Sequence, residues 1–362
     1  MRGRHLLVLL PFLLSAAEPA WQRSYFFDKP LSEFNIADFA CPSPKLCLAV
    51  GTVQQNDGRP YPYAVITHDG GEHWTAQKPA ENPVSLHFLN ESTGWMVTAR
   101  GIWNTTDGGD TWKKIRIGRG YVRVFFTDAQ HGWLVGSKRL FEQTTDGGVH
   151  WLGVSDAGIN FAPPADSTFE HVHFSDSLHG IVVGEVAGQS DSQLPDWMDP
   201  QTARYRATDG SVFAGSTTDG GRTWNWGTVA SHQKLMIAAF PAADHGWLVF
   251  APDSPDQLES KVTKRNWIDR KSTTVYHLDA ARISDLDVSG DRFLVVAAVQ
   301  MAGKLSNTPV PGKVRILTGD GFSTLRDEAV DYRAVARRII LAGSLSGWFA
   351  ATDTGMILRR KR

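Results

Sequence analysis

The sequence predicts an all-β chain that folds into a single seven-bladed β-propeller of four-stranded antiparallel blades, closed by an N-terminal strand that completes the last blade. Three observations predict this fold. One turn recurs in four near-copies, short strand-like runs flank each copy, and the last repeat stops one strand short of a full unit. Repeats of this length are typical of propellers, in which each unit is one small sheet.

The recurring turn has the form Thr-x-Asp-Gly-Gly-x-x-Trp. Its glycines adopt positive φ without steric cost, and its Asp can accept backbone N–H groups of its own turn. Its Trp re-enters a strand and buries a large ring. We interpret the Asp as a turn former, since this chemistry accounts for the whole motif; a calcium ligand or a catalytic acid is the alternative. The Asp and Trp positions are Asp69 and Trp74, Asp107 and Trp112, Asp146 and Trp151, and Asp219 and Trp224.

Residues 83–117 form the clearest repeat, with four short strand-like runs separated by turns. A Phe six residues before a Gly, as in Phe88 and Gly94, marks the register in several copies. Phe39 starts an earlier copy, in which we align Cys47 with the Trp that follows the Gly elsewhere. The predicted blades span roughly residues 36–78, 83–117, 121–155, 168–230, 235–278, 282–327, and 333–360 together with 21–27.

The last repeat predicts how the ring closes. Gly347-Trp348 aligns with Gly94-Trp95, which puts Asp353 in the turn between the second and third strands. The fourth strand is then missing. Residues 21–27 have the pattern of that strand, so we expect them to pair with residues 356–360 and to remove the open sheet edges.

The turn pattern resembles the Asp-box, also called the bacterial neuraminidase repeat. The longer unit, with Gly-Trp upstream of the box, is similar to the photosystem II stability/assembly factor family and its non-photosynthetic bacterial relatives. The similarity is strongest over residues 36–230. It implies a propeller but no particular activity, because Asp-boxes occur on glycosidases, sorting receptors and non-catalytic assembly factors alike.

Composition and the first residues bear on location. The chain has 362 residues, 42% of them hydrophobic, and a formal net charge of −1, so it has no overall basic field for nucleic acid. Residues 1–17 read as a signal peptide, with Arg2 and Arg4 before the apolar run Leu6–Leu14 and a cut after Ala17. An uncleaved anchor is the alternative, but the run is shorter than the roughly 20 residues of a membrane helix. We expect an exported protein, periplasmic or secreted.

Cys41 and Cys47 flank a predicted turn, and a disulfide between them would suit an oxidising compartment. A metal pair and a free dithiol are the alternatives, but two thiols without a nearby His make a poor zinc site. We expect no cofactor.

The long insertions fall mainly in the turns between second and third strands. In a propeller these turns share one side of the disc with the links between blades, and we call that side the loop face. The Asp-boxes belong to the opposite side, the Asp-box face. Variable loops on a rigid scaffold are where binding usually resides. The insertions are residues 54–62, 187–210, 251–260 and 302–312, with a longer blade link at 155–167.

Two groups of loop-face residues are candidates for binding a partner. One is a cationic cluster that could hold carboxylates, unless it is simply solvated loop charge. The other belongs to a long loop with an exposed Trp-Met pair, unless Trp197 folds back onto its blade. The family resemblance implies an arginine-rich face for a protein partner. The candidates are Arg100, Arg116, Arg119, Arg123, Lys138 and Arg139 in the cluster, and Trp197, Arg204 and Arg206 in the loop.

Three histidines, His87, His171 and His173, occupy innermost strands. A metal site in the channel is conceivable, but no carboxylate or third ligand has convincing spacing, so we expect histidines without metal.

Two functions remain in view. A sialidase-like or other glycosidase, or a carbohydrate-binding propeller, would explain the Asp-boxes, but the sialidase Arg-Ile-Pro motif is missing, since Arg116-Ile117 is followed by Gly118. A non-catalytic scaffold that holds another exported or membrane protein needs nothing that the sequence lacks. We favour the scaffold, acting as a monomer.

Overall fold

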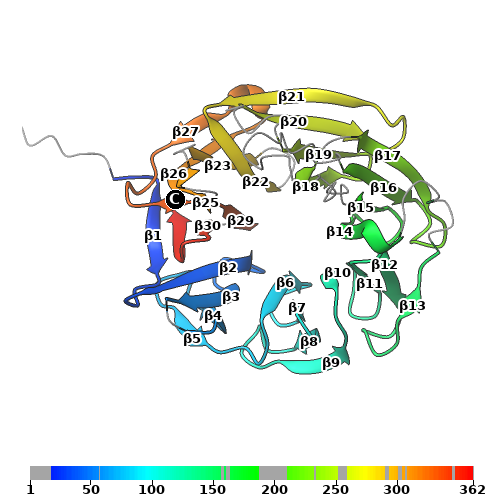
Figure 1. Ribbon diagram of the computed structural model, residues 1–362, viewed down its shortest axis with the longest axis horizontal. Helices are drawn as coiled ribbons and strands as arrows, with labels where there is room; N and C mark the ends of the chain where they lie inside the picture. The colour runs from blue at the N-terminus through cyan, green and yellow to red at the C-terminus, as the bar shows by residue number, and fades with distance from the viewer. Residues whose placement is uncertain are drawn as a thin grey trace, which may run out of the picture.

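The computed structural model is a ring of seven four-stranded antiparallel sheets around a central axis (Figure 1), which confirms the predicted fold class. The structure describes residues 18–56, 58–155, 159, 164–186, 210–231, 234–251, 259–289, 293–300, 304–305, 308–344 and 347–361. Within these ranges the secondary structure is β-strand apart from two short 3₁₀ helices, η1 (Pro164–Asp166) and η2 (Phe322–Thr324).

The first four blades follow the chain directly, and in each the innermost strand comes first. Their strands are β2 (Ser32–Ala40), β3 (Cys47–Gln55), β4 (Tyr61–Thr67) and β5 (Thr75–Gln77); β6 (Pro83–Phe88), β7 (Gly94–Thr98), β8 (Gly101–Thr105) and β9 (Lys113–Ile117); β10 (Tyr121–Phe126), β11 (Gly132–Gly136), β12 (Leu140–Thr144) and β13 (Leu152–Gly153); and β14 (Ser167–Phe174), β15 (Gly180–Val186), β16 (Ser211–Thr217) and β17 (Asn225–Ser231).

The last three blades keep this order with two additions in the sixth, a short strand paired with β26 and a two-stranded ribbon. Their strands are β18 (Leu235–Ala242), β19 (His245–Phe250), β20 (Glu259–Asn266) and β21 (Ser272–Asp279); β22 (Ala281–Ser289), β23 (Phe293–Gln300), β26 (Gly312–Gly319) and β27 (Arg326–Glu328), with β28 (Val335–Ala336) and the ribbon β24 (Lys304–Leu305) and β25 (Thr308–Pro309); and β29 (Ile339–Ser344), β30 (Gly347–Thr352), β31 (Met356–Arg360) and β1 (Trp21–Phe26).

The ring closes where the sequence predicts. Strand β1 pairs antiparallel with β31, and Trp21 lies opposite Arg360. The Trp21 side chain is fully buried, and its Nε1 donates a 2.7 Å hydrogen bond to Glu328 of the neighbouring sixth blade. Pairing between the two ends of the described chain therefore completes the seventh sheet, and β1 covers the edge of β31 that would otherwise be open.

The apolar core lies between successive blades, where aromatic side chains stack. The Trp95 ring lies 3.6 Å from that of Phe126 in the next blade, and Trp133 lies 3.7 Å from Phe174 in the same way. The Phe also covers the glycine opposite it in its own blade. A Cβ on Gly132 would approach the Phe126 ring to 2.6 Å, so only glycine fits beneath the ring.

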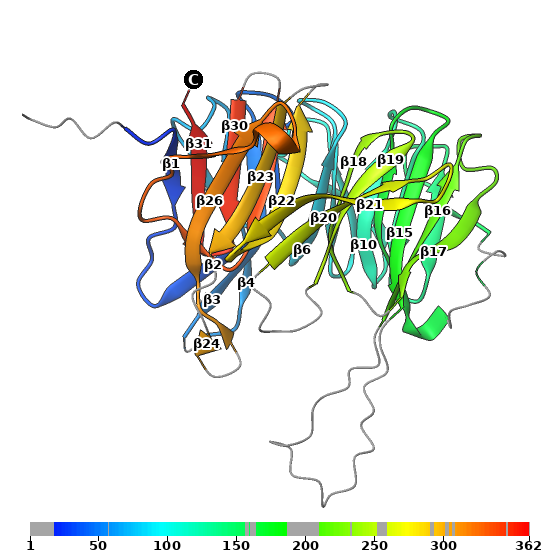
Figure 2. The same cartoon turned by 90° about the horizontal axis from the view of Figure 1, so that it is seen from above.

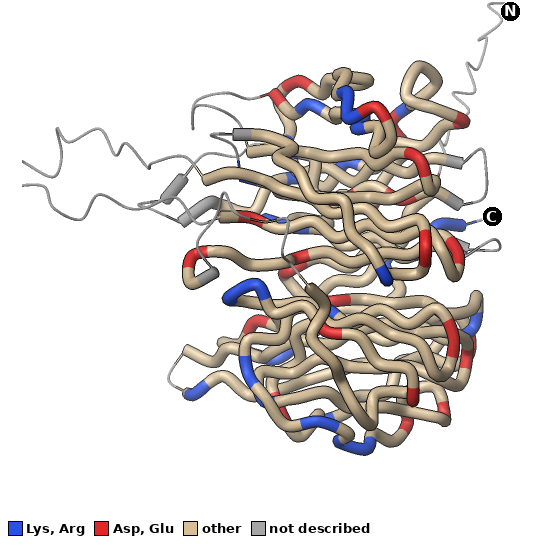
Figure 3. Tube along the Cα trace, turned by 90° about the vertical axis from the view of Figure 1, so that its right-hand side faces the viewer, with Lys and Arg blue, Asp and Glu red and all other residues tan. Residues whose placement is uncertain are grey.

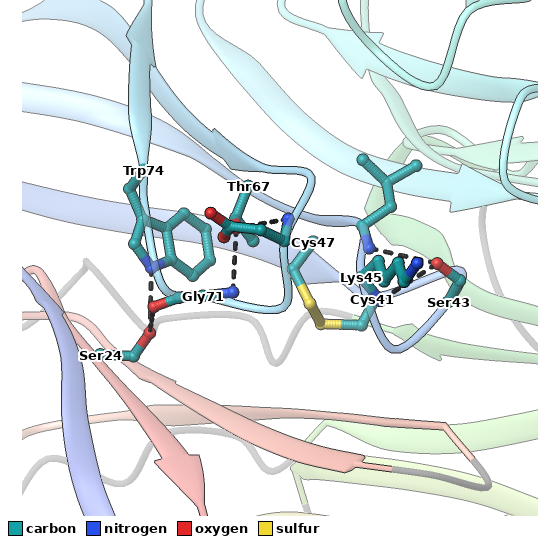
Figure 4. Close-up of a disulfide and its surroundings, with 10 residues drawn as sticks. Ser24, Cys41, Ser43, Lys45, Cys47, Thr67, Gly71 and Trp74 are labelled. Carbon is teal, nitrogen blue, oxygen red and sulfur yellow. Dashed lines mark hydrogen bonds between the residues drawn. A yellow bond between two sulfur atoms is a disulfide. The ribbon is translucent and has the colours of Figure 1, made fainter.

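The first blade replaces this Phe–Gly contact by a disulfide. Cys47 pairs with Thr67 just as Gly94 pairs with Thr105, so Cys47 holds the glycine position; the sequence-based alignment with the Trp is wrong by one residue. Cys41 lies six residues earlier, where Phe88 stands in the second blade, and the two cysteines are bonded (Figure 4). The predicted disulfide is thus confirmed, and it joins the same two strand positions as the aromatic contact elsewhere.

Because the disulfide and the Phe–Gly contact occupy the same two strand positions, we can predict the effect of replacing the disulfide by a Phe and a Gly. Cys41→Ser with Cys47→Ser should lower the free energy of unfolding by about 2 kcal/mol, the chain-entropy value for so short a loop. Cys41→Phe with Cys47→Gly should recover part of that loss, because the ring can then cover the glycine. Denaturant titration measures both variants, with reduced wild type as the control. Equal stability of the two variants would contradict the equivalence.

Candidate functional site

The Asp-box turns lie on one side of the disc and share one set of hydrogen bonds. In the first copy the Thr67 hydroxyl accepts the Gly71 N–H at 2.9 Å (Figure 4). The same hydroxyl donates to Asp69 at 2.8 Å, and Asp69 accepts the His73 N–H at 2.9 Å. The same contacts recur at Thr105, Thr144 and Thr217. The glycines have positive φ, as the sequence predicts.

These bonds use the oxygens of the Asp for the turn itself. Hydrogen bonds from the Thr223 hydroxyl and amide lower the pKa of Asp219 to about 2, and bonds from the His150 amide and ring do the same for Asp146. The indoles also serve the turn, since Trp112, Trp151 and Trp224 each donate to the carbonyl of the second Gly. Trp74 instead donates to Ser24 of the closing strand β1 (Figure 4).

The loop face lies on the other side of the disc. The described parts of the insertions join second to third strands, as between β3 and β4 and between β23 and β26. In the edge-on view the ribbon β24–β25 projects on the side opposite the end of the chain (Figure 2). Much of the insertion sequence, including Trp197, Arg204 and Arg206, lies outside the described residues.

Backbone hydrogen bonds join three neighbouring loops of this face. The Gly118 N–H donates to the Arg100 carbonyl at 3.1 Å, and the Ser137 N–H donates to the Gly120 carbonyl at 2.8 Å. The turn after β7, the link from β9 to β10 and the turn after β11 therefore form one continuous strip. Arg100, Arg119 and Lys138 lie on this strip with exposed side chains, and we call these three residues the cationic strip. Several Lys and Arg segments lie in the lower part of Figure 3, where Figure 1 places β9 and β10.

Two of the other candidates hold the protein together. Arg116 pairs with Glu142 at 2.7 Å, donates to the Tyr121 hydroxyl at 2.7 Å and lies over the Trp151 ring, so it clamps the second blade to the third. Arg139 donates from Nη1 to the Ile159 carbonyl at 2.9 Å. Neither side chain is an unengaged member of the cluster expected from the sequence.

Arg123 lies elsewhere. A β-bulge between Tyr121 and Arg123 interrupts the alternation of β10, and Arg123 lines a cavity in the central channel. His87, His171 and His173 line the same cavity. Burial, with some repulsion from Arg123, lowers the pKa of His87 to about 4 and that of His171 to about 3. Among the described residues no group of three or more His, Cys, Asp or Glu side chains could hold a metal ion.

Sequence reasoning missed four carboxyl groups whose pKa is raised by partial or full burial. Burial and repulsion from Asp287 raise the pKa of Asp285 to about 7, and burial raises that of Asp287 to about 6. Both line the same channel cavity as His87, His171 and His173. Glu185 lies on β15, and burial together with repulsion from the nearby Glu170 raises its pKa to about 7. The Asp-x-Asp pattern on an innermost strand is the only sequence signal for the first pair.

The seven-bladed ring and its Asp-box turns together place this chain in the class of Asp-box propellers. Within that class, residues 114–188 match the model of the family described as photosynthesis system II assembly factor YCF48, which confirms the resemblance read from the sequence. No curated protein matches the chain significantly. Within the described ranges, no helix has the length and apolar character needed to cross a bilayer.

The chain is also similar to solved propellers. A structure of YCF48 bound to a D1 peptide is 15% identical, with 95% of this chain and 98% of that chain covered and a TM-score of 0.62. YCF48 from Cyanidioschyzon merolae is 15% identical, with 94% and 98% covered and a TM-score of 0.60. The GH74 enzyme of Niastella koreensis is 12% identical, with 89% and 64% covered and a TM-score of 0.48. At these identities the two YCF48 structures establish a shared fold and no more.

The Asp-box bonds predict an acid-sensitive contribution to stability. Because the folded pKa of Asp219 is about 2 and its ordinary value is 3.8, the contribution is complete above the ordinary value and is lost as pH falls toward 2. Asp219→Asn should therefore melt below wild type at pH 7, and the gap should close near pH 2. Thermal melts by circular dichroism measure the gap. Asp320→Asn, which removes an exposed charge outside the four boxes, is the control and should leave the melting temperature nearly constant.

Proposed function

We propose that this chain is an exported, non-catalytic scaffold that binds a protein partner through its loop face. The observation that carries the proposal is the cationic strip, in which Arg100, Arg119 and Lys138 stand exposed on three loops joined by backbone hydrogen bonds. Because backbone hydrogen bonds hold the three loops on the ring, binding does not have to order their backbone, and a partner can meet all three charges at once.

The chemistry of the strip favours a partner with carboxylates. Arginine holds a carboxylate through two parallel hydrogen bonds, and exposed cations steer an acidic surface toward the binding face. The solved relative that binds a D1 peptide supports a protein or peptide partner for a propeller of this shape. We extend that binding role to this chain, with a partner that is itself exported or lies in a membrane.

The opposite face is less suited to a specific partner. Its Asp-box carboxylates accept hydrogen bonds within their own turns, as at Asp107, and its Asp-box indoles donate within their turns, as at Trp112, or to β1, as at Trp74.

A glycosidase is the alternative. The observation that favours it is Glu185, whose raised pKa and acidic neighbour Glu170 resemble the environment of a general acid. Glu185 also accepts the Leu235 N–H, a bond that ties the fourth blade to the fifth.

Charge reversal tests the face. The variant Arg100→Glu, Arg119→Glu and Lys138→Glu should lose most of the partner that wild type captures from cell-envelope extract, because three attractive charges become repulsive. The matched control, Lys45→Glu, Lys113→Glu and Arg222→Glu, reverses three exposed charges near the Asp-box face and should retain the partner. Quantitative mass spectrometry of the captured proteins compares the three forms, with melting temperatures as a fold check.

Two results would contradict the scaffold. Equal recovery of the partner by all three forms would remove the loop face from the proposal. Hydrolysis of fluorogenic glycosides by the wild type that is lost in Glu185→Gln would show that the protein is a glycosidase instead.

Export has a separate test. Expression of the full chain should yield a mature protein that begins at Glu18, because the small residues before it suit signal peptidase. Mass spectrometry of the intact protein from the periplasm or the medium measures the cut. Recovery of the uncleaved chain from the membrane would favour the anchor instead.

A further inference from the structure

A pocket of about 740 Å³ lies on the Asp-box face between the fourth and fifth blades. Its lining comes from β15, β16 and the Asp-box of the fourth blade, and from the turns after β18 and β20 in the fifth. The volume lies within the range of small-molecule sites, about 300–1,000 Å³. The pocket is on the opposite side of the disc from the cationic strip, and the proposed scaffold function does not use it.

The second, third and fourth blades each carry a pair of aromatic rings at the corresponding junction with the preceding blade. The first-strand Phe and the Asp-box Trp of one blade meet nearly edge to face, with ring centroids 6.1 or 6.2 Å apart. The Trp rests on the preceding blade, since Trp112 packs in one apolar cluster with Leu48 and Ile66. The pairs are Phe88 with Trp112, Phe126 with Trp151, and Phe174 with Trp224.

The fourth blade presents the same two positions to the fifth. Leu48 lies opposite Ile66, and Ile181 lies opposite Ser216, in each case one residue beyond the glycine position that begins the second strand. Ile181 and Ser216 are therefore the counterparts of the two residues that carry Trp112, and both line the pocket.

The rings of the fifth blade stand closer to the axis than those of its neighbours. Phe240 stacks on His173 at 5.4 Å and lines the channel cavity, where a register shift interrupts the pairing of β18 with β19. Trp267 takes the usual place of the Phe, because a Cβ on Gly246 would approach its ring to 2.7 Å. Both rings of this blade are thus used for the inner part of the junction.

The outer place, which the Asp-box Trp fills elsewhere, has no ring in the fifth blade. Arg265 lies opposite Gly246 just as Thr217 lies opposite Gly180, so the position of the Trp falls on Ser272. The Ser272 hydroxyl accepts a hydrogen bond from Arg265 at 3.1 Å. This loss of the Trp accounts for an opening beside Ile181 and Ser216.

The pocket is accessible to solvent. Thr218, Asn225 and Asp244 line it with exposed side chains, and Ile268 at its edge is 80% exposed. Exposed apolar area of this kind favours a ligand that removes it from water. The neighbouring hydroxyl, amide and carboxylate groups can meet polar substituents on such a ligand.

We propose that this pocket binds a planar aromatic ring of about the size of an indole. The ring lies on Ile181 and Ser216, as Trp112 lies on their counterparts in the first blade, and contacts Trp267 as a second ring. Ring pairs gain free energy beyond the area that they bury, so an aromatic ligand is favoured over an aliphatic one of equal size.

The test uses the mature full-length protein with labelled isoleucine methyl groups, and indole is the probe. In an NMR titration the signals of Ile181 and Ile268 should shift with saturation, whereas Ile66, already covered by Trp112, should not. Phenol should bind about threefold to tenfold more tightly than cyclohexanol, the value of one ring–ring contact. Binding of N-acetyltryptophanamide as well as indole would assign the pocket to a peptide side chain, and binding of indole alone to a free aromatic compound.

A variant locates the site. Ser216→Trp supplies a ring from the chain itself and should weaken indole binding at least about tenfold, while Thr228→Trp, at an exposed position of β17, should leave it unchanged. Circular dichroism checks the fold; if Ser216→Trp does not fold, the wild-type shifts and the comparison of phenol with cyclohexanol decide. Absence of saturable shifts at Ile181 and Ile268, equal affinity for phenol and cyclohexanol, or unchanged indole affinity in folded Ser216→Trp would each overturn the proposal.

Discussion

Contact between adjacent blades is the constraint on which the structure depends. Each blade buries its apolar face only against a neighbour, and the stack of Trp95 on Phe126 is the repeated form of that contact. The stack requires a glycine beneath the Phe ring, because any side chain there would displace the ring. Between the second and third blades and between the third and fourth, one glycine, one Phe and one Trp thus set how two blades approach. Ring closure by β1 completes the seventh blade.

The innermost strands add polar ties to this packing. Asp38 accepts the Leu86 N–H, Ser85 donates to the Val122 carbonyl, and Asp285 accepts the Leu341 N–H. Each side chain reaches from one blade to the first strand of the next. Buried polar groups are tolerated where such bonds satisfy them, so the channel wall can be polar without weakening the ring. These bonds account for Asp38, Ser85 and Asp285 on the innermost strands.

The fold could be predicted from the sequence because its signals are local. A turn such as Thr105–Trp112 contains all the groups that it needs, so its bonds follow from residue order alone. The closing strand could be predicted because the last repeat lacks its fourth member. Strand registers that depend on a β-bulge or another local irregularity could not be predicted from the sequence. The bulge before Arg123 turns that side chain to the channel, and the disulfide stands one position from its expected alignment.

The cationic cluster shows the same limit for the site. The sequence places six basic residues near one face but does not tell which of them are free to bind a partner. The structure does: Arg116 is engaged by Glu142 and Tyr121, whereas Arg119 is exposed. The Asp285 and Asp287 pair escaped notice because alternating residues on an inner strand become neighbours of other blades only after the ring has closed. Long-range assembly, rather than local pattern, decides which charges are free.

Closure by β1 also has a consequence for how the molecule is made. Strand β1 leaves the ribosome early, but its partner β31 is synthesised only after the other six blades. Early blades can form as local hairpins, but the ring stays open until β31 is made, and joining such distant segments is slow. Newly made chains therefore pass through a stage with an uncovered β-edge, which invites pairing between copies until the ring is complete.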